Sequence, residues 1–113
     1  MEEKLNKLKE YLQMETEISF EEFKEYYAGL IDSLNSEFNE MDQATCLQAR
    51  FICSIVKSNG EARAHRNKAN GKAFKKMAAK CSFWMEAIDH RLKKDGLTQG
   101  AIELAMNEFN NNM

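Results

Sequence analysis

No proline occurs in the 113 residues of this chain, and glycine occurs only five times. Proline breaks helices and glycine weakens them, so a chain with so few interruptions can run through long helices. Apolar residues recur at three- and four-residue steps along most of the sequence, which is the spacing of an amphipathic helix. We therefore expect an all-α fold, a compact bundle of four to five helices that forms a single domain over residues 1–113.

The N-terminal half predicts two helices. The first carries a narrow apolar stripe of Leu5, Leu8 and Leu12, which either packs on the core or forms the seam of a homodimer. The second begins after Ser19, because a serine followed by Glu22 three positions later forms a capping box. Its buried stripe is expected to consist of Phe20, Phe23, Tyr27, Leu30, Ile31, Leu34, Phe38 and Met41.

The third predicted helix is capped by Asp42 and is apolar nearly all round, which indicates a central position in the bundle. We expect this helix to stop or kink at residues 58–60, where the sequence reads Ser-Asn-Gly. Residues 61–71 have only alanines as apolar side chains, and they are either an exposed helical extension or a loop.

The C-terminal part predicts two more helices. One runs from about Lys72 to Asp95 and stops at Gly96, and the last is capped by Thr98. Residues 110–113 form a polar tail.

Charge is distributed unevenly along the chain. Residues 1–42 hold 4 basic and 12 acidic side chains, whereas residues 43–80 hold 9 basic and only 1 acidic one. Eight of these lysines and arginines fall within residues 57–80, although the whole chain has a net charge of −2. This basic segment is either a solvated helix face or a docking surface for an anionic macromolecule.

The basic segment provides the candidate binding residues. Lysines and arginines contact phosphate, and an aromatic ring on the same helix face stacks on bases or wedges between them. Counted at 100° per residue, Phe83 falls among the lysines and opposite Cys81, although it also has an ordinary explanation as a ring packed under a neighbouring helix. The candidate residues are Arg63, His65, Arg66, Lys68, Lys72, Lys75, Lys76, Lys80 and Phe83.

Residues suited to catalysis do not form a recognisable motif. The two histidines, His65 and His90, have no motif partner. The cysteines are odd in number and lack C-x-x-C spacing, so we expect free thiols, and Cys53 and Cys81 lie on apolar stripes where thiols are inert. We expect no catalytic residues, no metal and no cofactor.

Paired carboxylates offer one enzymatic alternative. Glu22 with Glu25, and Glu86 with Asp89, are each separated by three residues and project from one helix face. This pattern resembles the all-helical nucleotide pyrophosphohydrolases of the MazG type, in which such pairs hold divalent metal, although here the pairs lie about 60 residues apart. The resemblance implies a metal-dependent pyrophosphohydrolase; solvated surface acids are the ordinary explanation.

Two hypotheses of different classes follow. The first is a non-enzymatic accessory or regulatory protein that binds DNA, RNA or a nucleic-acid-bound complex through the basic segment. The second is a protein-binding modulator or inhibitor that uses its acidic second helix or its basic face against another protein surface. Small helical chains of this composition are typical of bacterial mobile elements and prophages. With no apolar run long enough for a bilayer and a charged N-terminus, we expect a cytoplasmic protein that does not enter membranes.

Overall fold

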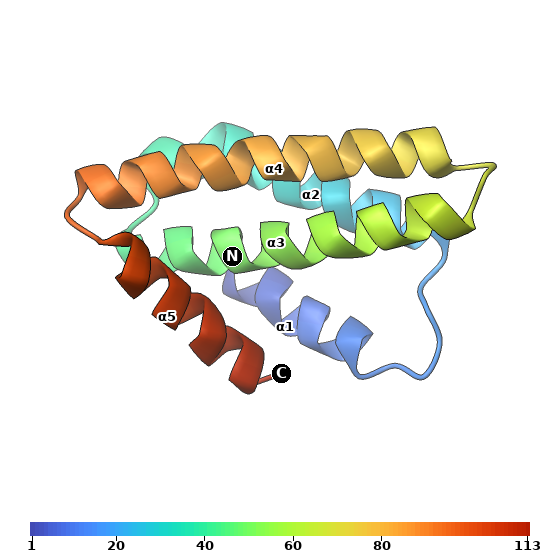
Figure 1. Ribbon diagram of the computed structural model, residues 1–113, viewed down its shortest axis with the longest axis horizontal. Helices are drawn as coiled ribbons and strands as arrows, with labels where there is room; N and C mark the ends of the chain where they lie inside the picture. Colours follow the sequence, from blue (N-terminus) through green and yellow to red (C-terminus); the bar gives the residue numbers. More distant parts are fainter.

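The computed structural model describes residues 1–113 and shows an all-α body of five helices without strands. The helices α1 to α4 and a short 3-10 helix, η1, are followed by α5 (Figure 1). Their bounds are Glu2–Leu12 for α1, Phe20–Glu37 for α2, Phe38–Glu40 for η1, Gln43–Arg66 for α3, Gly71–Lys94 for α4 and Gln99–Asn111 for α5. The predicted fold class is confirmed.

Three polar residues begin helices as predicted. The side chains of Ser19, Asp42 and Thr98 each accept a hydrogen bond from the backbone N–H three residues later, at 3.1, 2.8 and 3.1 Å. These bonds satisfy N–H groups that have no partner inside the helix. Gly96 ends α4 with a φ of +103°, a left-handed conformation that glycine adopts without a steric penalty.

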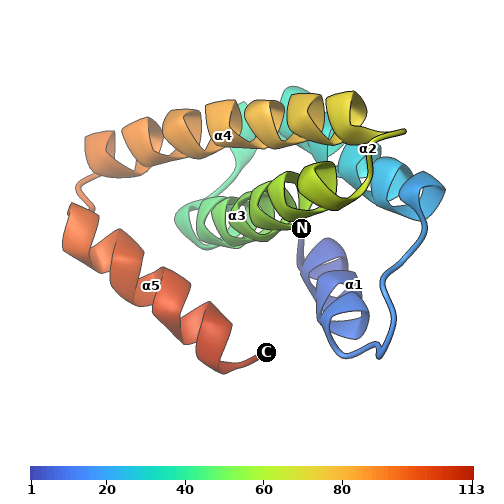
Figure 2. The ribbon, with the colours of Figure 1, turned by 45° about the vertical axis from the view of Figure 1, so that its right-hand side comes forward.

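Helix α3 is the centre of the fold, as its nearly continuous apolar character predicts. It runs antiparallel to α4, and these two helices share the most extensive contact in the molecule (Figure 1). Helices α1 and α5 also pack on α3, and Figure 2 shows them diverging from it on opposite sides. Seven residues of α3 are buried: Cys46, Ala49, Phe51, Ile52, Cys53, Val56 and Gly60.

The predicted interruption at residues 58–60 is wrong, because α3 continues without a break to Arg66. Gly60 is buried at the contact with α4, where a Cβ on it would lie 3.4 Å from the carbonyl oxygen of Phe74. A small residue at this position allows the two helices to approach closely, and tertiary packing offsets the low helix propensity of glycine. Of the two alternatives for residues 61–71, the first part is a helical extension: α3 continues as far as Arg66. A turn then leads to Gly71, where α4 begins.

The second helix is shorter than its apolar stripe predicts. It ends at Glu37, and Phe38–Glu40 form the 3-10 turn η1 before Met41, which is extended and buried. The guanidinium of Arg91 donates hydrogen bonds to the carbonyl oxygens of Phe38 and Met41, which gives this turn partners outside its own backbone.

The apolar stripe of α1 packs on the chain's own core. Leu5 and Leu8 are buried, and only Leu12 remains exposed, by 42%. The hydroxyl of Tyr26 donates to the carbonyl oxygen of Lys4 at 2.6 Å, which further fixes α1 to α2. Of the two alternatives for this stripe, packing on the chain's own core is the one that the structure shows.

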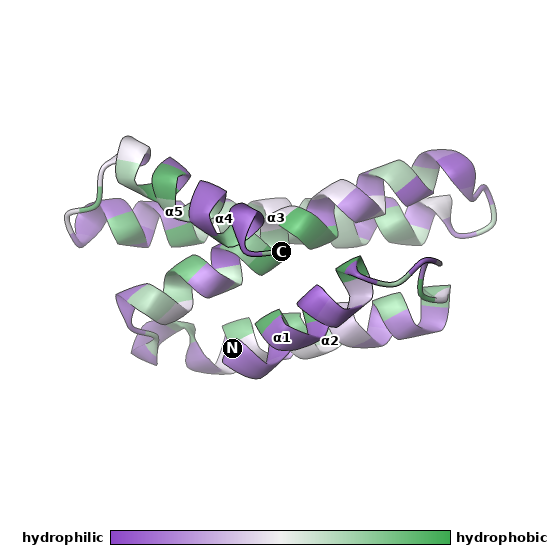
Figure 3. Ribbon diagram, turned by 90° about the horizontal axis from the view of Figure 1, so that it is seen from below, coloured by the Kyte–Doolittle hydropathy of each residue, from purple (hydrophilic) through white to green (hydrophobic).

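The helices form two groups that differ in charge. Figure 3 shows α1 and α2 on one side of the molecule and α5 on the other. Residues 1–42, which contain both α1 and α2, are the acidic part of the sequence. Most of the lysines of the chain that have no ion pair lie on α4. None of the helices combines the length and apolar character that crossing a membrane requires.

Candidate nucleic-acid interface

Four lysines of the basic segment lie on the outer side of α4. Lys72, Lys75, Lys76 and Lys80 are all exposed, and none of them takes part in an ion pair with a carboxylate. The opposite side of α4 is buried, and α3 runs alongside α4 over most of its length (Figure 1). We call these four residues together with Phe83 the α4 lysine face.

Phe83 belongs to this face, as the helical wheel predicts. Its side chain is 55% exposed, which is unusual for a large apolar residue in this chain. The ammonium nitrogen of Lys80 lies 5.0 Å from the centre of the Phe83 ring, and the buried Trp84 meets that ring edge-on at 5.7 Å. The ring is therefore held from one edge while much of its surface remains open to a stacking partner.

The exposed side of α4 that carries Phe83 has further cationic or titratable residues towards the C-terminal end of the helix. His90 and Lys94, seven and eleven residues after Phe83, are also exposed on the same side. Lys94 is absent from the predicted site because it lies outside the dense basic segment, although its spacing from Phe83 would have identified it. The 24 residues of α4 extend over about 36 Å, so the cations are spread along a line.

Arg63 has internal partners instead. Its side chain is only 12% exposed, and its Nη2 donates to the carbonyl oxygen of Ile18 at 2.9 Å. The guanidinium lies over the rings of Phe23 and Phe74, at 5.2 and 4.9 Å. These contacts make Arg63 a structural connection between the loop before α2 and the α3–α4 pair.

Arg66 shares a partner with Arg63. Its Nη2 lies 2.6 Å from Oε1 of Glu17, while Nε of Arg63 lies 3.6 Å from Oε2 of the same carboxylate. The hydrogen bond from Arg66 lowers the pKa of Glu17 below its usual value and raises that of Arg66. His65 and Lys68 are exposed and have no ion pair. The structure thus separates the predicted site into two arginines that share one carboxylate and a set of cations without an ion pair.

The cysteines are held as thiols in the core. Cys46, Cys53 and Cys81 are all free and buried. Burial raises the pKa of Cys46, and a hydrogen bond with Cys81 followed by burial raises the pKa of Cys53. Both shifts disfavour the thiolate, which is the nucleophilic form.

The paired carboxylates do not converge on a common point. No group of three or more His, Cys, Asp or Glu side chains lies in an arrangement that could hold a metal ion. Asp89, the second member of one pair, accepts hydrogen bonds from Nε and Nη2 of Arg50 on α3. This carboxylate therefore serves to join α3 to α4.

The fold and the surface define a small all-α protein with a cationic, aromatic-bearing helix face. Comparison with known proteins adds no relative to this description: no family model, no curated protein and no solved structure matches the chain.

Proposed function

We propose that this chain is a non-enzymatic helical accessory protein that binds the phosphodiester backbone of nucleic acid through the α4 lysine face. One observation carries the proposal: four exposed lysines share one side of a helix, and no carboxylate of the chain neutralises them. Leaving like charges unpaired side by side opposes folding, so their clustering is more readily explained by an anionic partner.

The expected binding mode is contact with phosphates rather than readout of bases. Lysines release condensed counterions when they neutralise phosphates, and each such contact contributes a slope of about −0.9 in log K against log salt for a duplex. Four contacts predict a slope of about −3.6. The open ring of Phe83 adds stacking on unpaired bases, which tolerates any sequence. The protein is therefore expected to bind with weak sequence preference.

Fluorescence anisotropy with a labelled duplex DNA and an RNA of the same sequence, at two salt concentrations, tests the proposal. The variant Lys72→Glu/Lys76→Glu reverses two charges of the face. The control is Lys7→Glu/Lys24→Glu, which makes the same change in net charge on α1 and α2; both lysines are exposed, and Lys7 pairs with Glu10 at 3.3 Å. We expect the first variant to lose at least tenfold in affinity and the control much less. Equal losses would contradict a defined interface.

A protein partner is the second candidate, and the charge of α2 favours it. Glu21, Glu22 and Glu25 are exposed on that helix and have no ion pair with a basic side chain. If neither DNA nor RNA binds at low salt, the chain acts instead as a protein-binding modulator through this helix or through the basic face. Affinity purification with a variant that carries glutamines at the three positions would then lose the partner.

A further inference from the structure

The arginines of the predicted site line a polar hollow at the end of α3. This hollow has a volume of about 300 Å³ and contains no apolar side chain. It is lined by Glu17, Arg63, Arg66, Asn67 and Lys68. Glu17 comes from the linker between α1 and α2, and the other four come from the last turns of α3 and the turn that follows. The carboxylate is thus the one acidic group among three cationic side chains.

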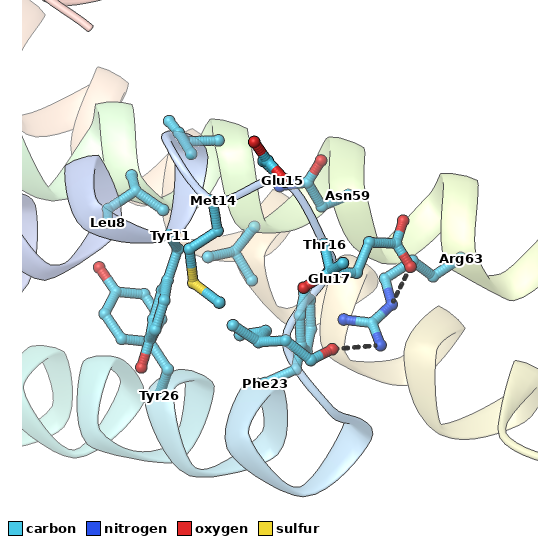
Figure 4. Close-up of a pocket in the computed structure, with 13 residues that line it drawn as sticks. Leu8, Tyr11, Met14, Glu15, Thr16, Glu17, Phe23, Tyr26, Asn59 and Arg63 are labelled. Atoms are coloured by element: carbon cyan, nitrogen blue, oxygen red, sulfur yellow. Dashed lines mark hydrogen bonds and ion pairs between the residues drawn. The ribbon is translucent and has the colours of Figure 1, made fainter.

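Glu17 has the position that an external anion would take. Its two oxygens face two guanidinium groups, at 2.6 Å from Arg66 and 3.6 Å from Arg63. Figure 4 shows the carboxylate of Glu17 beside Arg63 in the lining of a second, neighbouring cavity, to which α1, α2 and α3 also contribute apolar side chains such as Leu8, Phe23 and Val56. Carboxylate and phosphate oxygens bind guanidinium through the same charge-assisted hydrogen bonds, so a site that holds one is chemically suited to the other.

The pairing between Glu17 and Arg66 is accessible to a competitor. The side chain of Glu17 is 54% exposed and that of Arg66 is 58% exposed, so neither has been withdrawn from solvent. Exposed pairs of this kind contribute little stability, so a backbone phosphate, which carries the same single negative charge as the carboxylate, can compete with Glu17 for Arg66. Arg63, in contrast, is held by the carbonyl of Ile18 and by two aromatic rings, and it would remain in place.

We propose that this hollow is a phosphate-binding subsite of the nucleic-acid interface, and that Glu17 occupies it while no nucleic acid is bound. The inference rests on the proposed function and extends it. Lys68 lies in the turn that leads to Lys72, so it connects the hollow along the chain with the α4 lysine face. Glu17 therefore acts as an internal competitor that weakens binding by the intact chain.

The variant Glu17→Gln tests this competition, with Glu15→Gln as its matched control. Both glutamates are exposed in the same linker and both changes remove one negative charge, but Glu15 has no ion pair. We expect Glu17→Gln to bind a labelled duplex DNA roughly twofold to fivefold more tightly than the control, which corresponds to losing an exposed ion pair. Its salt slope should stay at the wild-type value, because the same phosphate contact forms in both complexes.

The double variant Glu17→Gln/Arg66→Gln identifies the group that receives the phosphate. It should lose the gain in affinity, and its salt slope should be shallower than that of Glu17→Gln by about one phosphate contact. Equal affinities of Glu17→Gln and Glu15→Gln, with wild-type binding still dependent on Lys72 and Lys76, would overturn the subsite and leave the proposed function standing. Failure of every variant and of the wild type to bind at low salt would overturn both.

A measurement on the wild-type chain does not depend on whether any variant folds. The carboxyl carbon of Glu17 can be followed by NMR through a pH titration, with and without duplex DNA. In the free protein Arg66 lowers the pKa of Glu17. Displacement by a phosphate removes that hydrogen bond, so the pKa should rise when DNA is bound, whereas an unchanged pKa in the complex would refute the displacement.

Discussion

Gly60 on α3 lies directly against the backbone of Phe74 on α4. A Cβ on Gly60 would be 3.4 Å from the Phe74 carbonyl oxygen and 3.5 Å from the Cβ of Ala78. Both distances correspond to ordinary van der Waals contact, so the space admits one methyl group and little more. The contact lies where the two longest helices pack together, within a stretch of α3 that reads locally as a helix end.

The effect of substituting Gly60 on the free energy of unfolding should change sign with the size of the new side chain. Gly60→Ala removes the high conformational entropy of glycine in the unfolded chain and fits the available space, so the free energy of unfolding should rise by about 0.5–1 kcal/mol. Gly60→Leu places three more carbons against α4 and should lower it by about 1–3 kcal/mol. Urea denaturation of both variants measures these changes in the free energy of unfolding. A destabilised Gly60→Ala variant would show that the space between α3 and α4 does not admit a methyl group.

Removal of the carboxylate at Asp89 should destabilise the α3–α4 pair. The side chains of Arg50 and Asp89 are only 14% and 22% exposed, and Nη2 of Arg50 lies 3.1 Å from Oδ2 of Asp89. Asp89→Ala leaves a largely buried guanidinium without its partner, so we expect a loss of about 2 kcal/mol in the free energy of unfolding. Chemical denaturation provides the measurement.

The control for this prediction is Asp32→Ala, because Asp32 is an exposed carboxylate without an ion pair. It should change stability by less than about 0.5 kcal/mol. Similar losses in the two variants would show that the ion pair does not join the helices.

Alkaline pH should destabilise the contact between α1 and α2. Burial, then the hydrogen bond to Glu22 and the charge of that carboxylate, raise the pKa of Tyr11 to about 12, from 10.0. Burial also raises the pKa of Tyr26, whose ring meets that of Tyr11 edge-on at 5.5 Å. A raised pKa in the folded state stabilises the fold below pH 10, and this stabilisation is lost as the pH rises from about 10 to 12.

Urea denaturation at a series of alkaline pH values measures this loss. Tyr11→Phe removes one of the ionising groups, so its free energy of unfolding should decline less steeply above pH 10 than that of the wild type. Tyrosinate absorbance should appear at a higher pH in the folded protein than in the unfolded chain. Coincident titration of the folded and unfolded forms would contradict the prediction.

Phe83 and its lysine neighbours should affect nucleic-acid binding in different ways. Phe83→Ala should weaken binding to single-stranded DNA by about 1–3 kcal/mol, the range of base–aromatic stacking, and leave the salt slope unchanged. Lys76→Ala should reduce the slope by about 0.7 on single strands, because one phosphate contact is lost. Anisotropy titrations at several salt concentrations separate the two effects.

Stability measurements provide the control for Phe83, which is 55% exposed. The alanine variant should retain nearly the wild-type free energy of unfolding, apart from the edge-on contact with Trp84, worth about 0.5–1.5 kcal/mol. Unchanged affinity of a folded Phe83→Ala variant would remove the aromatic ring from the proposed interface.

Local features of the sequence were sufficient to predict much of the candidate surface. The position of Phe83 among the α4 lysines follows from helical geometry alone, since 100° per residue determines which side chains share a face. The partners of Arg63 and Arg66 do not follow in this way. Glu17 lies 49 residues before Arg66, and no local pattern brings these two side chains together.

The sequence by itself determined the all-α class, the helix starts at Ser19, Asp42 and Thr98, and the central position of α3. These properties depend on hydrogen bonds and apolar spacing within a few residues, which are present in the chain before it folds. Only the tertiary structure decided that α3 continues through Gly60 and that Glu17 pairs with both Arg63 and Arg66. Both depend on which distant segments meet, and packing between helices supplies the free energy that overrides the local preference.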